Sequence, residues 1–428
     1  MKLPWKVVFC GIISNVLEAY DFLLYGMFSH IIAQLFFPDS KYSLIMTLTV
    51  FATGFVFRPF GALVLGSIGD YFGRKRALLI SAFFMSIPTV LIGCLPTFDQ
   101  IGLFAPILLI VCRLLQGFSV GGEYNGAAIF VIEHTSPAYS GFVGSFIATS
   151  STIGSLLALG AALLFTNSLM PEWSWRIPFF LGIFMGILGI YIRMMILESP
   201  EFKKYVDSKE HVKASFKSMI TQYYRQIICV IGIGGLNGVL GYTFFTYLNV
   251  YFKTVIDMPF GNSLMFVSIG LATLLIATPL SGFLSDKIGH GKLMAFGSLS
   301  LCLYSYPFYE ALQSSHDYVV IGGIVIAGCL SACFIGPSNA FMNQLFPVYI
   351  RYRGVALGFG AGMAIFGGTT PVLNTLLIQQ TENLGSPAIY VLICSLFGFL
   401  SSIYAMGILR QKESTPFSDR AVPVGQGV

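Results

Sequence analysis

One eleven-residue pattern occurs twice in this chain, and it restricts the possible folds more than any other feature. Residues 66–76 read GSIGDYFGRKR and residues 282–292 read GFLSDKIGHGK, each between two apolar runs. Three residues recur at an offset of 216 positions, about half of the 428 residues: Gly66, Asp70 and Gly73 as Gly282, Asp286 and Gly289. Two ordinary basic turns would also use glycine for a tight bend, but they would not share a constant offset. The repeat predicts two related halves.

The long apolar runs predict how each half is built. The chain is 55% hydrophobic and 10% charged, with a mean hydropathy of +0.79, whereas soluble proteins are about a quarter charged. Each run has about 20 residues or more, enough to cross a bilayer as a helix. We therefore expect an all-α polytopic membrane protein with twelve transmembrane helices in two six-helix halves. The expected divisions are residues 1–197 and 227–409 for the halves, 198–226 for a linker and 410–428 for a tail.

The basic residues predict the orientation. Of the 24 Lys and Arg residues, three are expected on the outer side (Lys41, Arg176, Lys253) and two within spans (Arg58, Arg113). The other 19 fall on the side of both termini, which the positive-inside rule makes cytoplasmic. Because these residues are spread over short loops rather than gathered in one stripe, no nucleic-acid partner is expected.

The first span, about residues 7–37, holds two acids. Ser14, Glu18, Asp21 and Tyr25 form one stripe at helical spacing. An acid in mid-span costs about 3 kcal/mol on insertion scales, so two acids on one stripe are expected to face a watery cavity rather than lipid. The alternative is that they only bond a neighbouring helix.

The second and fourth spans contain further charges. Arg58 could either extend to the cytoplasmic face or contact a substrate. Arg113 lies near the midplane, where a permanent charge needs a carboxylate or an anionic ligand. Glu123 lies ten residues later, about 15 Å nearer the cytoplasm. That depth matches the turn after the second span, where Arg74 is available as a partner.

The second half contributes amides and hydroxyl groups rather than mid-bilayer charges, among them Asn237, Tyr242 and Tyr247. The segment from 198 to 226 is the only long polar stretch. Ser199, Pro200 and Glu201 resemble the start of a helix, expected to lie along the cytoplasmic face. The eight cysteines nearly all fall in apolar runs and are expected to be packing residues, not metal ligands or disulfides.

Taken together, these residues resemble the major facilitator superfamily over essentially the whole chain, and the repeated turns are its signature. Four stretches resemble the metabolite:proton symporter family within it: NVLEAYDFLLYG (15–26), RLLQGFSVGGEY (113–124), WRIPF (175–179) and ESPEF (198–202). The resemblance implies that Asp70, Arg74 and Glu123 form a cytoplasmic gate, together with the glycines of the two turns and Asp286. It also implies that Arg113 acts in proton coupling and that Glu18 and Asp21 match the family's first-span acids.

Two positions depart from the family pattern. Ser140 stands where a basic residue is usual, and Gln344 stands where an acid commonly precedes Phe-Pro. Both weaken inferences about gating at those turns.

The resulting hypothesis is proton-coupled uptake of a small polar metabolite by rocking of the two halves. Burial favours the neutral carboxyl and a nearby Arg favours the ionised one, so a first-span acid near Arg113 can switch. Asp21 is the first choice for the proton carrier and Glu18 the second. One cation, Arg113, and one anion suit a zwitterion such as proline, betaine or another amino acid.

Tyr25, Tyr242 and Tyr247, with Asn237, are the other candidate substrate residues. The tyrosines could hold a quaternary ammonium by cation–π contact, or simply pack.

Three alternatives remain open: a symporter of organic acids, a proton-driven exporter and a non-transporting receptor. The chain has no motif of an enzyme, and no cofactor or metal is expected. We expect a monomer in the bacterial inner membrane, with protons, a small solute and the lipid bilayer as its partners.

Overall fold

The computed structural model describes residues 5–38, 42–166, 169–195, 198, 203 and 216–414, and every regular element within them is a helix. Eleven helical stretches are long and apolar enough to cross a membrane. A twelfth, α14 (His290–Leu312), has 23 residues and packs along α15 (Asp317–Leu345) and α18 (Pro387–Ser414). The predicted fold class, an all-α membrane protein of two six-helix halves, is confirmed.

The first half extends from α1 to α9, and some of its spans are made of two helices. In chain order its elements are α1 (Trp5–Met27), α2 (Ser29–Phe36), α3 (Ser43–Val56), α4 (Arg58–Phe72), α5 (Arg74–Cys94), α6 (Phe98–Ile101), α7 (Phe104–Glu133), η1 (Pro137–Tyr139), α8 (Ser140–Phe165), η2 (Glu172–Arg176) and α9 (Ile177–Met195).

The second half extends from α11 to α18 and includes three π-helical segments, η3, η4 and η5. Besides α14, α15 and α18 its elements are α11 (Phe216–Tyr242), η3 (Thr243–Tyr247), α12 (Leu248–Val250), η4 (Tyr251–Val255), α13 (Phe260–Ile288), α16 (Val348–Gly362), η5 (Met363–Gly367) and α17 (Thr370–Thr381).

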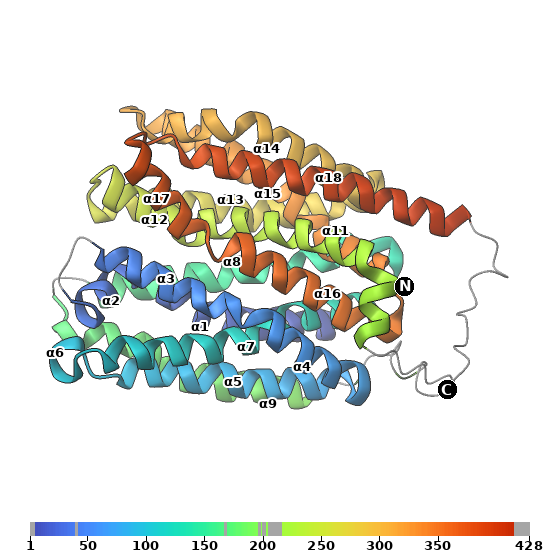
Figure 1. The fold of residues 1–428 in the computed structure, drawn as a ribbon, viewed down its shortest axis with the longest axis horizontal. Coiled ribbons are helices and arrows are strands. Elements are labelled where there is room, and N and C mark those ends of the chain that lie inside the picture. Colours follow the sequence, from blue (N-terminus) through green and yellow to red (C-terminus); the bar gives the residue numbers. More distant parts are fainter. Residues whose placement is uncertain are drawn as a thin grey trace.

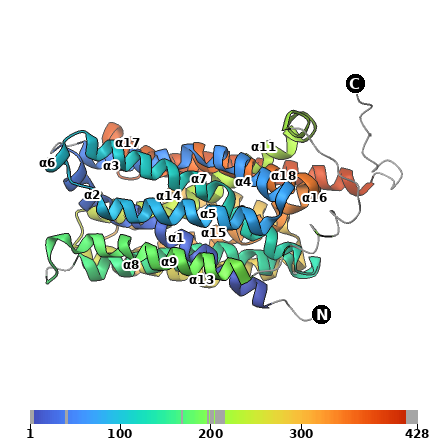
Figure 2. The ribbon, with the colours of Figure 1, turned by 90° about the horizontal axis from the view of Figure 1, so that it is seen from below.

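The two halves lie side by side with their helices along one common direction. In Figure 1 the blue and cyan helices of the first half form the lower layer, and the yellow to red helices α13, α14, α15 and α18 form the upper one. Helix α8 packs on α13 and α15, and α4 packs on α16, so these three pairings join the halves. Figure 2 shows that α1 begins and α18 finishes at the same end of the bundle, called here the termini side.

The repeated turns have the same backbone conformation. Gly73 joins α4 to α5 with φ 104°, and Gly289 joins α13 to α14 with φ 101°. These values lie in the region that glycine enters without steric penalty. The repeat in the sequence is therefore a repeat in the structure, because both helix pairs reverse direction at one left-handed glycine.

The second span is interrupted next to a proline, at the position of Arg58. α3 ends at Val56, and α4 begins at Arg58 with Pro59 in its first turn. A first-turn proline is tolerated because its missing N–H would have no partner there. The break places Arg58 at a helix start in the middle of the span.

The divisions predicted at 198–226 and 410–428 stay predictions. Of the linker, the structure describes Glu198, Lys203 and the start of α11, so the expected helix at Ser199–Glu201 lies outside the described residues. At the other division, α18 continues to Ser414.

Candidate functional site

A cavity lies between the two halves, and the space in it that protein atoms do not fill, including its opening to solvent, is about 710 Å³. Helices α1, α4, α7 and α8 line it from the first half, and α11, η3, α13, α15, α16 and η5 from the second. Among these described lining residues, the charged side chains are Glu18 and Arg58. Asn15, Tyr124, Asn237 and Tyr242 contribute further polar groups. The cavity therefore offers one anion and one cation in a mostly apolar wall.

Arg58 points into this cavity and does not extend to the cytoplasmic face. Its side chain is 4% exposed, and its Nη2 donates a hydrogen bond to the Tyr242 hydroxyl across the two halves at 3.0 Å. The guanidinium carbon lies 4.1 Å from the centre of the Phe55 ring. Its Nε has no partner among the described residues, so a donor remains available to a bound anion.

Arg113 is buried in an aromatic cage rather than paired with an acid. Its guanidinium carbon lies 4.2 Å from the ring centre of Phe22, 4.7 Å from Tyr25 and 5.0 Å from Phe51. Its Nη1 donates to Gln116 Oε1 at 2.7 Å. Among the described residues, no carboxylate forms an ion pair with Arg113.

The predicted proximity of Arg113 to a first-span acid is therefore wrong. Phe22 directly follows Asp21, and adjacent helical positions point about 100° apart. Asp21 instead lines a different pocket, together with Glu123 and Arg193.

The acids share a separate chamber inside the first half. Ser14, Glu18 and Asp21 of α1 line it with Glu123 of α7 and Arg193 of α9, and the space that protein atoms do not fill, including its opening to solvent, is about 220 Å³. The predicted stripe on α1 thus lies along one chamber, apart from Tyr25. Glu18 also lines the central cavity, so it stands at the boundary between the two spaces.

Glu123 pairs with Arg193 in this chamber, so its predicted contact with Arg74 is wrong. Helix α7 continues to Glu133, and it is Glu133 that lies within 3.7 Å of Arg74. Ten residues separate the two acids, about 15 Å along the helix. Helix α7 extends further than the sequence suggested, so Glu133 and not Glu123 lies at the depth of Arg74. Arg193, counted from the sequence as a cytoplasmic residue, is 3% exposed and lies inside the half.

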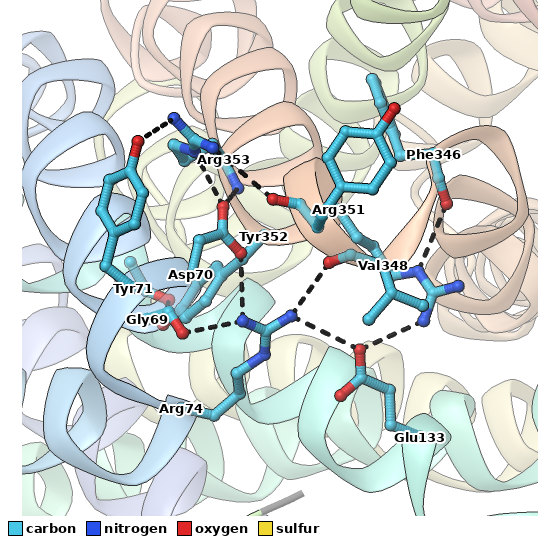
Figure 3. Close-up of polar contacts among 12 residues, drawn as sticks. Gly69, Asp70, Tyr71, Arg74, Glu133, Phe346, Val348, Arg351, Tyr352 and Arg353 are labelled. Atoms are coloured by element: carbon cyan, nitrogen blue, oxygen red, sulfur yellow. Dashed lines mark hydrogen bonds and ion pairs between the residues drawn. The ribbon is translucent and has the colours of Figure 1, made fainter. Parts of the chain in front are cut away.

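Five charged residues form a first latch on the termini side: Asp70, Arg74, Glu133, Arg351 and Arg353 (Figure 3). Asp70 accepts from Arg74 Nη1 at 3.1 Å and from Arg353 Nε at 2.9 Å. Glu133 accepts from Arg351 Nη1 at 3.1 Å. Because Arg351 and Arg353 belong to α16 and the others to the first half, the cluster ties the halves together.

Asp286 forms a second latch, in which the acid belongs to the second half and its partners belong to the first. Its two carboxylate oxygens accept hydrogen bonds from the backbone N–H groups of Gly141 and Phe142, both at 2.8 Å. These groups belong to the first turn of α8, where the helix dipole favours an anion. His290 lies 3.9 Å from Asp286 and 3.3 Å from the Ser140 hydroxyl. Ser140, which departs from the family pattern, is thus part of a latch without an arginine among its described residues.

The two remaining turn glycines permit close approach of the halves at these latches. A Cβ atom on Gly66 would lie 3.3 Å from Arg353 Cα, and one on Gly282 would lie 2.6 Å from the Gly141 carbonyl oxygen. Both contacts are with the other half. The placement of Gly66 and Gly282 therefore suits the predicted gate.

Replacing Gly282 with alanine is expected to loosen the second latch. The added Cβ overlaps backbone of α8, and overpacking of this kind costs about 1–3 kcal/mol. A cysteine introduced at Ala148, which lines the cavity, should then react about tenfold faster with a thiol reagent supplied from the termini side. For this measurement the eight native cysteines are first replaced, so that the introduced cysteine is the one labelled. Gly407→Ala is the matched control, because a Cβ there meets nothing within 4 Å. Equal labelling rates in both variants would contradict the expectation.

The other predicted substrate residues divide into two groups. Tyr242 and Asn237 line the central cavity, and Asn237 donates to Ser338 at 2.8 Å. Tyr25 donates to the Thr47 carbonyl at 3.1 Å, and Tyr247 packs beside Tyr251. Neither Tyr25 nor Tyr247 belongs to the described cavity lining.

Some residues of these sites were not predicted from the sequence: Tyr124 in the cavity, Arg193 in the chamber, and Glu133, Arg351 and Arg353 in the first latch. For the residues of the first latch, the sequence did contain an indication. Arg351 and Arg353 lie in the basic turn between α15 and α16, and Glu133 ends an apolar run. Arg193 gave no such signal, because an Arg at the end of a span usually marks the cytoplasmic boundary.

Comparison with known proteins gives two kinds of match. The family model described as "Sugar (and other) transporter" matches residues 7–218 and 201–406. The "Proline/betaine transporter" of Escherichia coli strain K12 is 32% identical over 413 residues, covering 93% of this chain and 82% of that protein. The "Glycine betaine/proline/ectoine/pipecolic acid transporter OusA" of Dickeya dadantii strain 3937 is 30% identical over 414 residues, with coverage of 93% and 82%.

A solved structure supports the fold. The major facilitator superfamily proton:xylose symporter XylE, bound to 6-bromo-6-deoxy-D-glucose, superposes with a TM-score of 0.76 at 15% identity, covering 95% of both chains. At this identity the likeness concerns the arrangement of the helices alone.

Proposed function

The chain belongs to the sugar (and other) transporter family, and we propose that it takes up a small zwitterion of the proline or betaine type together with protons. Two relatives with coverage of 93% of this chain are named for transport of such solutes. The chain is a transporter and not an enzyme.

The observation that supports a zwitterion best is the charge content of the central cavity. Arg58 with its unpartnered Nε, and the Tyr242 hydroxyl beside it, suit a carboxylate. Glu18, on the same cavity, suits the ammonium group. Buried charges need partners of opposite sign, so a ligand with one of each satisfies both side chains.

Aromatic rings next to these charges suit a methylated ammonium. Phe22, Tyr124 and Phe359 line the cavity, and the rings of Tyr124 and Phe359 are stacked with their centres 5.2 Å apart. The face of an aromatic ring attracts a cation without requiring hydrogen bonds, which a quaternary ammonium cannot donate. An organic acid with two carboxylates would instead bring its second charge near Glu18.

Transport follows from alternating closure at the two ends of the cavity. We take the termini side as cytoplasmic, in a bacterial inner membrane, because most Lys and Arg residues belong to that side. Both latches then hold the cytoplasmic end shut, and uptake requires that both open. The protein is proposed to work as a monomer on proton-motive force, with no cofactor and no nucleic-acid partner.

Uptake by proteoliposomes tests this function. The purified protein is reconstituted, an inward proton gradient is imposed, and labelled proline, glycine betaine, 2-oxoglutarate, citrate and shikimate are offered with and without a protonophore. Accumulation of a zwitterion that the protonophore abolishes is the expected result. Accumulation confined to the organic acids would overturn the substrate class, and efflux from preloaded vesicles without uptake would indicate an exporter. Binding without flux would indicate a receptor.

A further inference from the structure

We propose that Arg193 of α9 is the cation that controls proton binding in the first half. By moving between Glu123 and the two acids of α1, it decides which carboxyl group is ionised. The proposal rests on the proton-coupled function above, and it assigns to Arg193 the part that the sequence suggested for Arg113.

The chamber is lined by buried polar side chains. Glu18, Asp21, Glu123 and Arg193 are each 6% exposed or less, and Ser14 is 4% exposed. Ser14 Oγ, Glu18 Oε2 and Asp21 Oδ1 have no hydrogen-bond partner among the described residues. Polar atoms buried to this degree without partners are unusual in folded proteins. They indicate a place where a proton is exchanged, rather than a finished structural network.

The charges in the chamber do not balance if all acids are ionised. Three carboxyl groups face one guanidinium, and that guanidinium is committed to Glu123. Glu18 also borders the central cavity, which Arg58 lines, whereas Asp21 lines the chamber alone, and no ion pair of Asp21 is found among the described residues. An unpaired buried carboxylate is strongly unfavourable. Asp21 therefore carries a proton in this state.

Arg193 is positioned to reach the other acids. It lines the same chamber as Glu18 and Asp21 and is paired with Glu123. Two glycines of α9 leave room for this movement: a Cβ on Gly189 would lie 3.0 Å from Arg193 Nη1, and one on Gly182 would lie 3.4 Å from Asp21 Oδ1. The wall from α5 contains Ala82, Met85 and Ser86, none of them ionisable.

Tyr352 connects this chamber to the first latch. It lies between the two latch arginines of α16, and its hydroxyl donates to the Gly122 carbonyl at 2.8 Å, next to Glu123. When the latch opens, Tyr352 leaves α7 and water reaches Glu123. Arg193 then turns to the α1 acids, and the proton leaves Asp21 for water on the termini side.

The first test separates a switch from a structural ion pair. Arg193→Gln and the double variant Arg193→Gln/Glu123→Gln are expected to lose at least tenfold in gradient-driven accumulation of proline or glycine betaine. Exchange of the same solute without a gradient should stay within about threefold of wild type. A pair with a purely structural role would be replaced harmlessly in the double variant, so recovery of accumulation there overturns the proposal. Ser86→Ala, which alters the chamber wall without charge, is the control.

The second test does not depend on transport. Infrared absorption of protonated carboxyl groups is followed against pH in purified wild type, Arg193→Gln and Asp21→Asn. Removing the cation favours the neutral acid, so the Asp21 band, identified by its loss in Asp21→Asn, should persist to a pH at least one unit higher. Arg193→Lys, which keeps the charge, should titrate near wild type. An unchanged titration in Arg193→Gln overturns the proposal even if the solute is not a zwitterion. Absence of zwitterion uptake by the wild type overturns only the proposed substrate.

Discussion

Replacing Arg58 with glutamine is expected to weaken binding of the zwitterionic substrate about 100-fold. Truncating one partner of a buried, hydrogen-bonded charge pair typically costs 2–5 kcal/mol, because the other charge is left unpaired. Among the described residues that line the central cavity, Arg58 is the cation, and Tyr242 orients it through the 3.0 Å hydrogen bond. The measurement is the dissociation constant of labelled proline and of glycine betaine in detergent, by equilibrium dialysis.

Two comparisons show whether the loss concerns the carboxylate. Choline has the quaternary ammonium of glycine betaine but no carboxylate, so its weaker binding should be nearly the same in wild type and Arg58→Gln. Tyr242→Phe keeps the cation and removes one hydrogen bond to a charged group, worth about 1.5–3 kcal/mol, and should give a smaller loss. An unchanged affinity for glycine betaine in Arg58→Gln would show that another residue binds the carboxylate.

Replacing Asp70 with asparagine is expected to open the first latch. The change leaves Arg74 and Arg353, which are 1% and 4% exposed, without the carboxylate that joins them. Breaking a buried pair in this way costs about 3–5 kcal/mol, so the open population should rise by at least 100-fold. The rate at which a thiol reagent labels Ala148→Cys from the termini side reports that population.

The control for this variant makes the same chemical change elsewhere. Asp99 is exposed in the first turn of α6, and Asp99→Asn should leave the labelling rate unchanged. The control also shows whether any lost carboxylate alters expression or folding. If Asp70→Asn labels no faster than Asp99→Asn, the first latch does not hold the termini side closed.

The fold was predictable because its signals are local. The apolar runs give the spans, and the turns at Gly73 and Gly289 give both the reversal and the repeat. The site was only partly predictable, because its geometry depends on where each helix ends and which face it presents. Because α7 continues ten residues beyond Glu123, the acid at the first latch is Glu133 and not the predicted Glu123. Arg113 contacts the ring of Phe22, the residue after Asp21, and adjacent helical positions point about 100° apart.

Arg58 and Arg193 show the limit of arguments from depth. Both could be assigned to the membrane boundary by position alone, since Arg commonly extends towards water. The break at Pro59 turns one into the central cavity, and pairing with Glu123 places the other in the chamber. These outcomes depend on contacts with residues 184 and 70 positions away, which periodicity along one helix does not reveal.

The crossed arrangement of the two aspartates makes opening of the termini side cooperative. Asp70 of the first half holds the start of α16, and Asp286 of the second half holds the start of α8. Any rocking that separates α4 from α16 also separates α13 from α8, because both contacts span the same seam. The free-energy barrier to opening is therefore the sum of the costs of breaking both latches. A state in which only one latch is broken is not stabilised, because the other latch still holds the seam closed. A solute leak through this end needs both latches open together, and weakening either one makes that opening more frequent.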